Sequence, residues 1–500
     1  MANQSAAQAP EQAVKTIDSL DALLKKVDLT APDESGDRKT SQGRLTHALN
    51  LLVDAVTNSE APVERVDKVL VDKVVSELDK KITNQVNEIL HHKDFQQMES
   101  SWRGLDFLVK RTDFRRNVKI EMLNASKEEL LNDFEEVPEL IQSGLFKHMY
   151  EQEYDQAGGE PFGAILGNYE FENTGADHAL LRELSKVAAS CHAPFIGSVG
   201  ASFFGQEDMQ KLALQPDVTA LFDQDAFAKW NSFRETEDSR YVGLTLPRFL
   251  LRLPYGPETR PAKNFHFVED ASGETHNNYL WGNGSYAFGS CLTRSFAEHG
   301  WCVNIRGPQS GGLVEDLPLH LYEASGGTTY KVPTEVLVSD RREYELAELG
   351  FIPLAFYKSK DYACFFSANS SQKPKEYTGK DGDYATSNSR LSSRLPYLFL
   401  VSRLAHYVKV MQRENIGSSL ERDELQLRLQ DWIGTLVTEM PSPTPELKAR
   451  CPLSAAQIEV MDVADNPGFY KVDMKVRPHF QIEGIDVNLS LVSRLPKAKN

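Results

Sequence analysis

The chain has 500 residues, and its 55 lysines and arginines against 72 aspartates and glutamates give a formal net charge of −17. This acidic excess argues against nucleic acid or an anionic membrane surface as the main partner, because both bind clustered positive charge. Charged residues make up 25% of the chain and hydrophobic residues 41%, which is typical of globular proteins. The length predicts two to four domains.

The sequence indicates a cytoplasmic protein without membrane insertion. Its N-terminus lacks the basic region and apolar core of a secretory signal, and no stretch approaches the roughly 18 apolar residues of a membrane span. The odd number of cysteines and the absence of a CxxC pair argue against a disulfide framework and a zinc site. We therefore expect buried, reduced thiols. They are Cys191, Cys291, Cys302, Cys364 and Cys451.

The first 45 residues read as a flexible arm that carries one short amphipathic helix, at about residues 14–29. Apolar residues spaced by 3, 4 and 3 positions give this helix a single apolar face. They are Ile17, Leu20, Leu24 and Val27. A polar stretch without periodicity, residues 31–43, follows the helix. Two readings stay open: the helix docks on its own domain, or it is a partner motif on the arm.

Residues 46–100 are expected to be a helical region with a linker, because apolar residues keep a helical period over 44–56 and 63–90. His91 and His92 follow the second helix. Adjacent histidines point in different directions on a helix, so we interpret them as favoured by the dipole at the helix C-terminus rather than as metal ligands.

Residues 101–370 predict an α/β body. A helix at 177–191 lies between apolar strands at 161–171 and 193–199, and such a unit predicts parallel pairing with a right-handed crossover. We also expect a strand at 118–123, and a helix at 285–301, closed by Gly300, that leads into a strand at 302–307.

The C-terminal part changes character. Residues 371–392 are polar and aperiodic, and are expected to be an exposed loop or linker. Residues 393–500 predict two helices followed by an antiparallel β meander. Its three alternating runs lie at 455–463, 469–476 and 485–493. The fold class is thus mixed α/β and multi-domain.

Motifs for enzyme chemistry are weak or missing, so no catalytic residue, cofactor or metal is expected. Residues 281–284 begin like a dinucleotide loop, but Ala287 stands where the last glycine is needed. Residues 307–312 lack the Lys-Ser/Thr of a phosphate loop. Arginine-aromatic clusters at 101–105, 233–241 and 247–256 are either interface anchors or buried arginines bound to backbone carbonyls.

Several long strings carry a resemblance that runs from about residue 60 to 497. They are SWRGLDFLV, PFGAILGNYEF, EDSRYVGLTLPRFLLRLPYG, LWGNGSYAFGS, RLPYLFLVSRLAHYVKV and VRPHFQIEGIDVNLSLVSRLP. Together they resemble the large sheath subunit of the bacterial type VI secretion system, the TssC/VipB family. The resemblance implies a non-enzymatic protein with a fold similar to that of phage tail sheath proteins.

The resemblance also implies partners. The chain is expected to pair with a small sheath subunit of the TssB/VipA type and to polymerise with further copies as a helical tube around the Hcp inner tube. The tube is assembled on a baseplate, its contraction propels the inner tube and effectors out of the cell, and a ClpV-type ATPase dismantles it. The alternatives are a sheath from another phage-tail-like contractile particle and a soluble enzyme of unknown class.

Two sets of site residues follow from the resemblance. The ATPase is expected to grip the N-terminal helix through Ile17, Leu20, Leu23, Leu24 and Val27. A sheet shared between neighbouring subunits is expected to include the last alternating run, through Ile485, Val487, Leu489 and Leu491.

Overall fold

The structure is a computed structural model, and it describes residues 68–263, 265–271, 275–324, 327–379, 382–416, 421–438, 440–462 and 470–479. Contacts divide the chain into two compact units, Met1–Val86 with Lys263–Phe267, and Asn87–Ala262 with Val268–Asn500. Helix α3 (Lys68–Leu90) supplies most of what is described in the first unit. The expected domain boundaries stay predictions.

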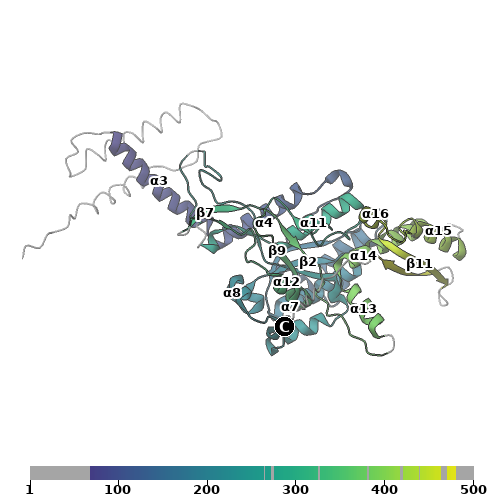
Figure 1. Ribbon diagram of the computed structural model, residues 1–500. Coiled ribbons are helices and arrows are strands. Elements are labelled where there is room, and N and C mark those ends of the chain that lie inside the picture. Colours follow the sequence, from purple (N-terminus) through teal and green to yellow (C-terminus); the bar gives the residue numbers. More distant parts are fainter. Residues whose placement is uncertain are drawn as a thin grey trace, which may run out of the picture. The chain divides into compact units, whose positions relative to one another are not determined.

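The second unit mixes helices and strands, which confirms the expected fold class (Figure 1). Its longer α-helices are α4 (Lys93–Lys110), α5 (Lys127–Glu135), α7 (Gly175–Cys191), α11 (Gly284–His299), α12 (Asp340–Glu348), α13 (Gly382–Ser392), α14 (Leu395–Glu414) and α15 (Arg422–Gly434). The shorter ones are α6 (Gly144–Phe146), α8 (Met209–Leu214), α9 (Thr219–Phe222), α10 (Ala228–Arg234) and α16 (Pro445–Arg450). A π-helix, η3, spans Lys147–Asp155.

A six-stranded sheet forms the centre of this unit, in the order β1-β2-β3-β9-β10-β6. The strands are β1 (Ile165–Phe171), β2 (Phe195–Val199), β3 (Val242–Leu246), β6 (Leu313–Val314), β9 (Ile352–Phe356) and β10 (Ala363–Phe365). The first four in this order pair in parallel, and β10 pairs antiparallel with β9 and β6. The predicted unit of β1, α7 and β2 is confirmed. Every residue of β2, β3 and β9 is buried, as expected for strands covered on both faces.

Three two-stranded sheets account for the other strands of the described residues. They are β4 (Phe249–Leu250) with β5 (Trp281–Gly282), β7 (His320–Ala324) with β8 (Gly327–Lys331), and β11 (Leu453–Asp462) with β12 (Tyr470–Pro478). All three are antiparallel. The first two runs of the predicted C-terminal meander are therefore confirmed, and the third lies outside the described residues.

Local sequence signals explain where the long helices begin and end. The Thr174 side chain accepts a hydrogen bond from the Asp177 amide at the start of α7, and Asn283 caps α11 in the same way. Gly300 ends α11 with a φ of 80°, a left-handed conformation that costs glycine little. The predicted end of this helix is confirmed.

Four local predictions are corrected. Residues 118–123 form no strand, because alternation alone does not supply a neighbouring edge. Residues 302–307 enter a tight turn instead of a strand, and the Arg306 amide donates to the Ser310 carbonyl. The expected loop at 371–392 contains α13. His92 caps the start of α4 by accepting from the Asp94 amide, so it belongs to the next helix.

Helix α14 joins two hydrophobic cores. Leu395 and Phe399 are buried in the large core around the central sheet. Leu400 and Leu404 are buried in a smaller core formed with α15 and β11. Since one continuous helix contributes to both, the α/β body and the C-terminal elements are packed as one piece. All five cysteines are free. Cys191, Cys291 and Cys364 are buried, as expected, but Cys302 and Cys451 are only partly buried.

Candidate assembly interface

The site residues expected from the resemblance lie outside the described residues. These are the apolar positions of the N-terminal helix, Ile17, Leu20, Leu23, Leu24 and Val27, and the last alternating run, Ile485, Val487, Leu489 and Leu491. The described part nevertheless includes the sheet that leads into the second set. That sheet, the ribbon of β11 and β12, is the candidate interface.

The ribbon is anchored on one face and regular along its length. Its register places Ile458 opposite Met474 and Val460 opposite Val472. Ile458 and Val460 are 2% and 3% exposed, and they pack into the smaller core with α15, which lies beside β11 in Figure 1. The alternation of apolar and polar residues that predicted these strands therefore reflects a ribbon with one face buried and the other exposed.

The outer edge of β11 is closed by two glutamines of α15. The Ile458 amide donates to Oε1 of Gln430 at 2.9 Å, and Nε2 of Gln430 donates to the Ala456 carbonyl at 3.3 Å. The Val460 amide donates to Oε1 of Gln426 at 3.2 Å. These side chains take the backbone groups that another strand would need, so β11 does not offer a free edge.

The outer edge of β12 is open in the part of the chain that the structure describes. The backbone groups of residues 471–476 make hydrogen bonds only to β11 there. Lys471, Lys475 and Arg477 are exposed along this strand. A row of unpaired amides and carbonyls is a template for strand addition by another chain or by a following segment. The sequence predicted the ribbon but gave no signal for which edge is blocked.

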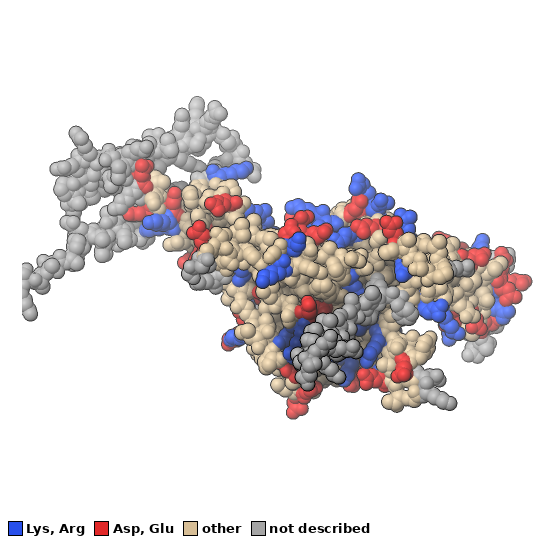
Figure 2. All heavy atoms as spheres, in the orientation of Figure 1, with Lys and Arg blue, Asp and Glu red and all other residues tan. Residues whose placement is uncertain are grey.

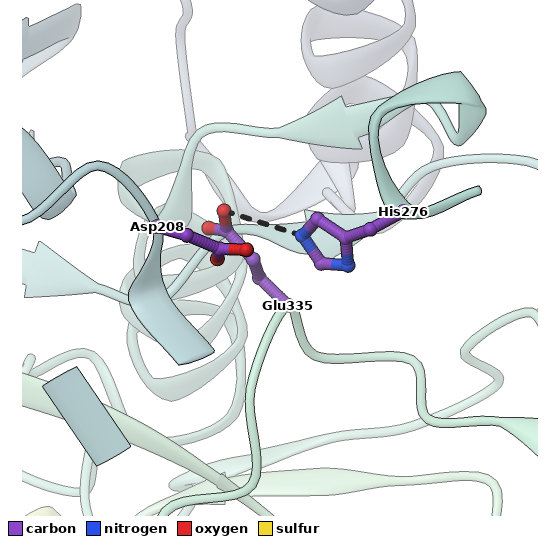
Figure 3. A group of neighbouring side chains, drawn as sticks. All are labelled: Asp208, His276 and Glu335. Carbon is purple, nitrogen blue, oxygen red and sulfur yellow. Dashed lines mark ion pairs between the residues drawn. The ribbon is translucent and has the colours of Figure 1, made fainter. Parts of the chain in front are cut away.

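One cluster has the residue types of a metal site. Single ligand atoms of Asp208, His276 and Glu335 lie within 4.8 Å of one another (Figure 3). Glu335 is already engaged by Arg248, whose Nε and Nη2 donate to its two oxygens at 3.0 and 2.6 Å. Burial alone would raise the pKa of the Glu335 carboxyl, but the hydrogen bonds from Arg248 lower it to about 2.

His276 is also unsuited to metal binding, because the ring nitrogen that faces the cluster carries a proton. Lys331 Nζ lies 3.2 Å and Gln210 Nε2 3.4 Å from Nδ1 of His276. Both groups are donors, so Nδ1 acts as the acceptor and the proton is assigned to Nε2. Nε2 faces Oε1 of Glu335 at 3.6 Å. A cation would meet an N–H and the charges of Arg248 and Lys331, so the cluster is a structural ion-pair network.

Of the two interpretations of the arginine-aromatic clusters, the structure mostly favours buried structural arginines over interface anchors. Arg234 is 5% exposed and donates to the carbonyls of Ser371 and Glu348. Arg252 is equally enclosed and pairs with two glutamates, Glu99 and Glu269. Trp102 is the exception, because 61% of it is exposed.

The glycine loops also have structural roles. Gly284 lies so close to Thr245 that an added Cβ would contact its hydroxyl at 2.7 Å, so this glycine allows α11 to pack against β3. The amides of Gly307 and Gly312 donate to the carbonyls of Phe365 and Gly307, so they are not available to a phosphate. Within the described residues, helices are too short or too polar to span a membrane.

Comparisons with known proteins identify the family to which this chain belongs. The family model "EvpB/VC_A0108, tail sheath N-terminal domain" (VipB) matches residues 72–372, and the model of the "tail sheath gpW/gp25-like domain" matches residues 384–495. The chain belongs to this family of tail sheath proteins. It is 47% identical over 433 residues to the type VI secretion system sheath protein TssC1 of Pseudomonas aeruginosa, covering 86% of each chain.

Two solved structures are more distant. The chain matches the baseplate of the anti-feeding prophage with 11% identity and a TM-score of 0.38, over 75% of this chain and 83% of that one. It matches the contracted helical sheath of the same particle with 10% identity and a TM-score of 0.32, over 63% and 66%.

Proposed function

We propose that this chain is the large subunit of a type VI secretion contractile sheath in the bacterial cytoplasm. It pairs with a small sheath subunit, polymerises as a helical tube around an Hcp inner tube on a baseplate, and contracts to propel that tube. The observation that carries the proposal is the edge of β12 that no described residue occupies, beside the blocked edge of β11, in a chain of the tail sheath family.

The packing of α14 supports the mechanical part of the proposal. A contractile lattice needs rigid subunits that rotate without separating. Because α14 belongs to both cores, rotation moves the α/β body and the ribbon together. Strand exchange at β12 then keeps neighbours joined, since backbone hydrogen bonds survive rigid-body motion when the connecting segments yield. With hundreds of copies, even about 1 kcal/mol per subunit sums to a large release.

The charges on the surface favour complementarity over short distances between neighbouring subunits, and the net charge of the chain does not. On the face shown in Figure 2, acidic and basic side chains are interspersed over much of the surface despite the net charge of −17. We expect short-range pairing of such opposite charges to set the register between subunits, while long-range attraction contributes less.

The shared sheet gives the first test. Removing residues 485–500, with Ile485, Val487, Leu489 and Leu491, should leave the complex with the small subunit intact but prevent tube formation, because the strand that links neighbours is gone. Co-purification measures the first property and negative-stain electron microscopy the second. Removal of residues 495–500 alone, which spares the alternating run, is the control. Normal tubes from the longer truncation would contradict the proposal.

The N-terminal helix gives the second test. We propose that its apolar face binds the groove of a ClpV-type ATPase after contraction, as an amphipathic helix in a groove. Leu20→Asp with Leu24→Asp places two charges on that face and should abolish ATPase binding while tubes still form. Asp18→Asn, outside the apolar face, is the control. A pull-down with unchanged ATPase binding by the double variant would refute this assignment.

A further inference from the structure

Helix α15 follows the outer edge of β11, the place where a further strand would otherwise add (Figure 1). Gln426 and Gln430 are four positions apart, so they lie on the same face of α15. They meet the amides of Val460 and Ile458, which alternate residues of β11 provide. Four helical residues rise by about 6.0 Å and two strand residues by about 6.6 Å. The repeat of the helix therefore matches the repeat of the strand.

Gln430 offers β11 the same groups as one residue of a neighbouring strand. Its Oε1 accepts from the Ile458 amide at 2.9 Å, and its Nε2 donates to the Ala456 carbonyl at 3.3 Å. A strand residue likewise contributes one donor and one acceptor from its backbone. Gln426 adds an acceptor, Oε1, 3.2 Å from the Val460 amide. Side chains of one helix thus stand in for a strand.

The two ends of the same edge also have partners. At the start of β11, the Leu453 amide donates to the Leu436 carbonyl, and the Leu453 carbonyl accepts from the Thr438 amide. At the other end, Arg422 of α15 lies 3.5 Å from Asp462. This exposed ion pair contributes little to stability. The partners of β11 nevertheless extend from its first residue to its last, and all of them belong to α15 or to the segment that follows it.

Buried apolar residues hold α15 in the position that these contacts require. Leu425, Leu429 and Ile433 are 7%, 2% and 0% exposed, and they belong to the smaller core together with residues of β11. Leu425 and Leu429 each directly precede one of the glutamines. Because neighbouring helical residues point in adjacent directions, burial of the leucines against the ribbon places the glutamines at its edge.

The register of the ribbon shows which groups of β12 an added strand would use. Directly opposite residues of an antiparallel pair either bond to each other or both turn their backbone groups outward. Ile458 and Val460 turn theirs to α15, so Met474 and Val472, which lie opposite, turn theirs away from β11. Among the described residues, no helix or strand hydrogen-bonds to these outward groups.

We infer that Gln426 and Gln430 determine on which side the shared sheet grows, because they close β11 and confine strand addition to β12. The inference rests on the proposed function and deepens it: it fixes the strand order as β11, β12 and then the added strand. A ribbon with two available edges would be a template on both sides. With β11 closed, each subunit accepts added strands along a single edge.

Hydrogen exchange resolved to single amides tests this strand order in the full chain co-expressed with the small sheath subunit. Sedimentation separates tubes from unassembled complexes. On assembly, exchange at the Val472 and Met474 amides should slow by about tenfold or more, because an added strand accepts their hydrogen bonds. Exchange at Ile458 and Val460 should not change, because their amides are already bound. Unchanged exchange at β12, or tenfold slower exchange at β11, would overturn the inference.

Alanine in place of both glutamines tests their role directly. Gln426→Ala with Gln430→Ala removes the edge contacts and favours the helix, since alanine is the best helix former. In unassembled complexes, exchange at Ile458 and Val460 should become about tenfold or more faster. On assembly it should slow again, because strands then add to β11 as well, and irregular aggregates should sediment beside the tubes. Gln457→Ala, exposed on β11, is the matched control.

Glutamate distinguishes an edge contact from a general effect on stability. Gln426→Glu keeps an oxygen acceptor for the Val460 amide, so exchange there should stay slow. Gln430→Glu loses the donor to the Ala456 carbonyl, so exchange at Ile458 should rise, but less than with alanine.

Regular tubes from the double alanine variant, with β11 exchange as in the unsubstituted chain, would overturn the inference. The first experiment needs no substitution, so it decides the strand order even if the variant fails to fold. If the unsubstituted chain and the small subunit form no tubes, the proposed function fails instead.

Discussion

Replacing Arg252 with methionine is expected to lower the free energy of unfolding by about 3–5 kcal/mol, because it leaves the buried carboxylate of Glu269 without its arginine and removes one of the two arginines that contact Glu99. Arg252 Nε donates to Glu99 at 2.8 Å and Nη1 to Glu269 at 2.7 Å. The side chains of Arg252 and Glu269 are 3% and 1% exposed. Arg103 also contacts Glu99, at 2.7 Å, but it does not reach Glu269.

Two further variants show whether the loss of stability comes from unpaired buried charge or from lost packing. Arg252→Met combined with Glu99→Gln and Glu269→Gln should recover much of the loss, since no buried charge then lacks a partner. Lys110→Met, which breaks the exposed pair with Asp106 on the same helix, should cost less than about 0.5 kcal/mol. Urea unfolding of the purified chains measures all three. A loss below about 1 kcal/mol for Arg252→Met would contradict the account of this cluster.

Acidification from pH 6.5 to pH 4 is expected to remove about 3 kcal/mol of stability through His406 alone. Burial lowers the pKa of this histidine to about 4, and the positive charges of Arg403 and Lys409 act in the same direction. Its Nε2 lies 2.9 Å from the Cys191 carbonyl, and its Nδ1 is buried without a partner. The folded chain therefore keeps the ring neutral.

The direction of this change in the free energy of unfolding follows from proton uptake. Below the ordinary histidine pKa of 6.5, the unfolded chain binds a proton that the folded chain rejects, so the free energy of unfolding falls until pH reaches about 4. His406→Gln removes this group, and its unfolding free energy should fall less over the same range by about 3 kcal/mol. The low pKa of Glu335 acts at lower pH, between about 4.5 and 2. Parallel pH profiles for the two chains would refute the assignment.

The sequence was most informative where periodicity and capping coincide. The unit of β1, α7 and β2, the helix closed by Gly300, and the β11–β12 ribbon all combine a regular apolar pattern with a defined end. The strand predicted at 118–123 was wrong because a strand requires a partner edge, which is a property of the tertiary structure. His92 was wrongly assigned to the end of the preceding helix because α3 and α4 are separated by only a short turn.

Contacts between elements that are distant in the sequence were harder to predict. Gln426 and Gln430 look like ordinary polar residues of an amphipathic helix, yet they close one edge of the ribbon. Arg252 and Glu99 are 153 positions apart, so no local pattern links them. Arg403 lies within a helix that was predicted correctly, but its unpaired Nε depends on which side chains surround it.

Electron microscopy of the chain co-expressed with the small sheath subunit tests the central claim most directly. The account predicts hollow tubules with a regular helical surface in negative stain, because heterodimers whose β12 edge accepts a strand from a neighbour continue to add subunits. Discrete, monodisperse particles over a range of salt concentrations, from a complex that contains both subunits, would contradict it.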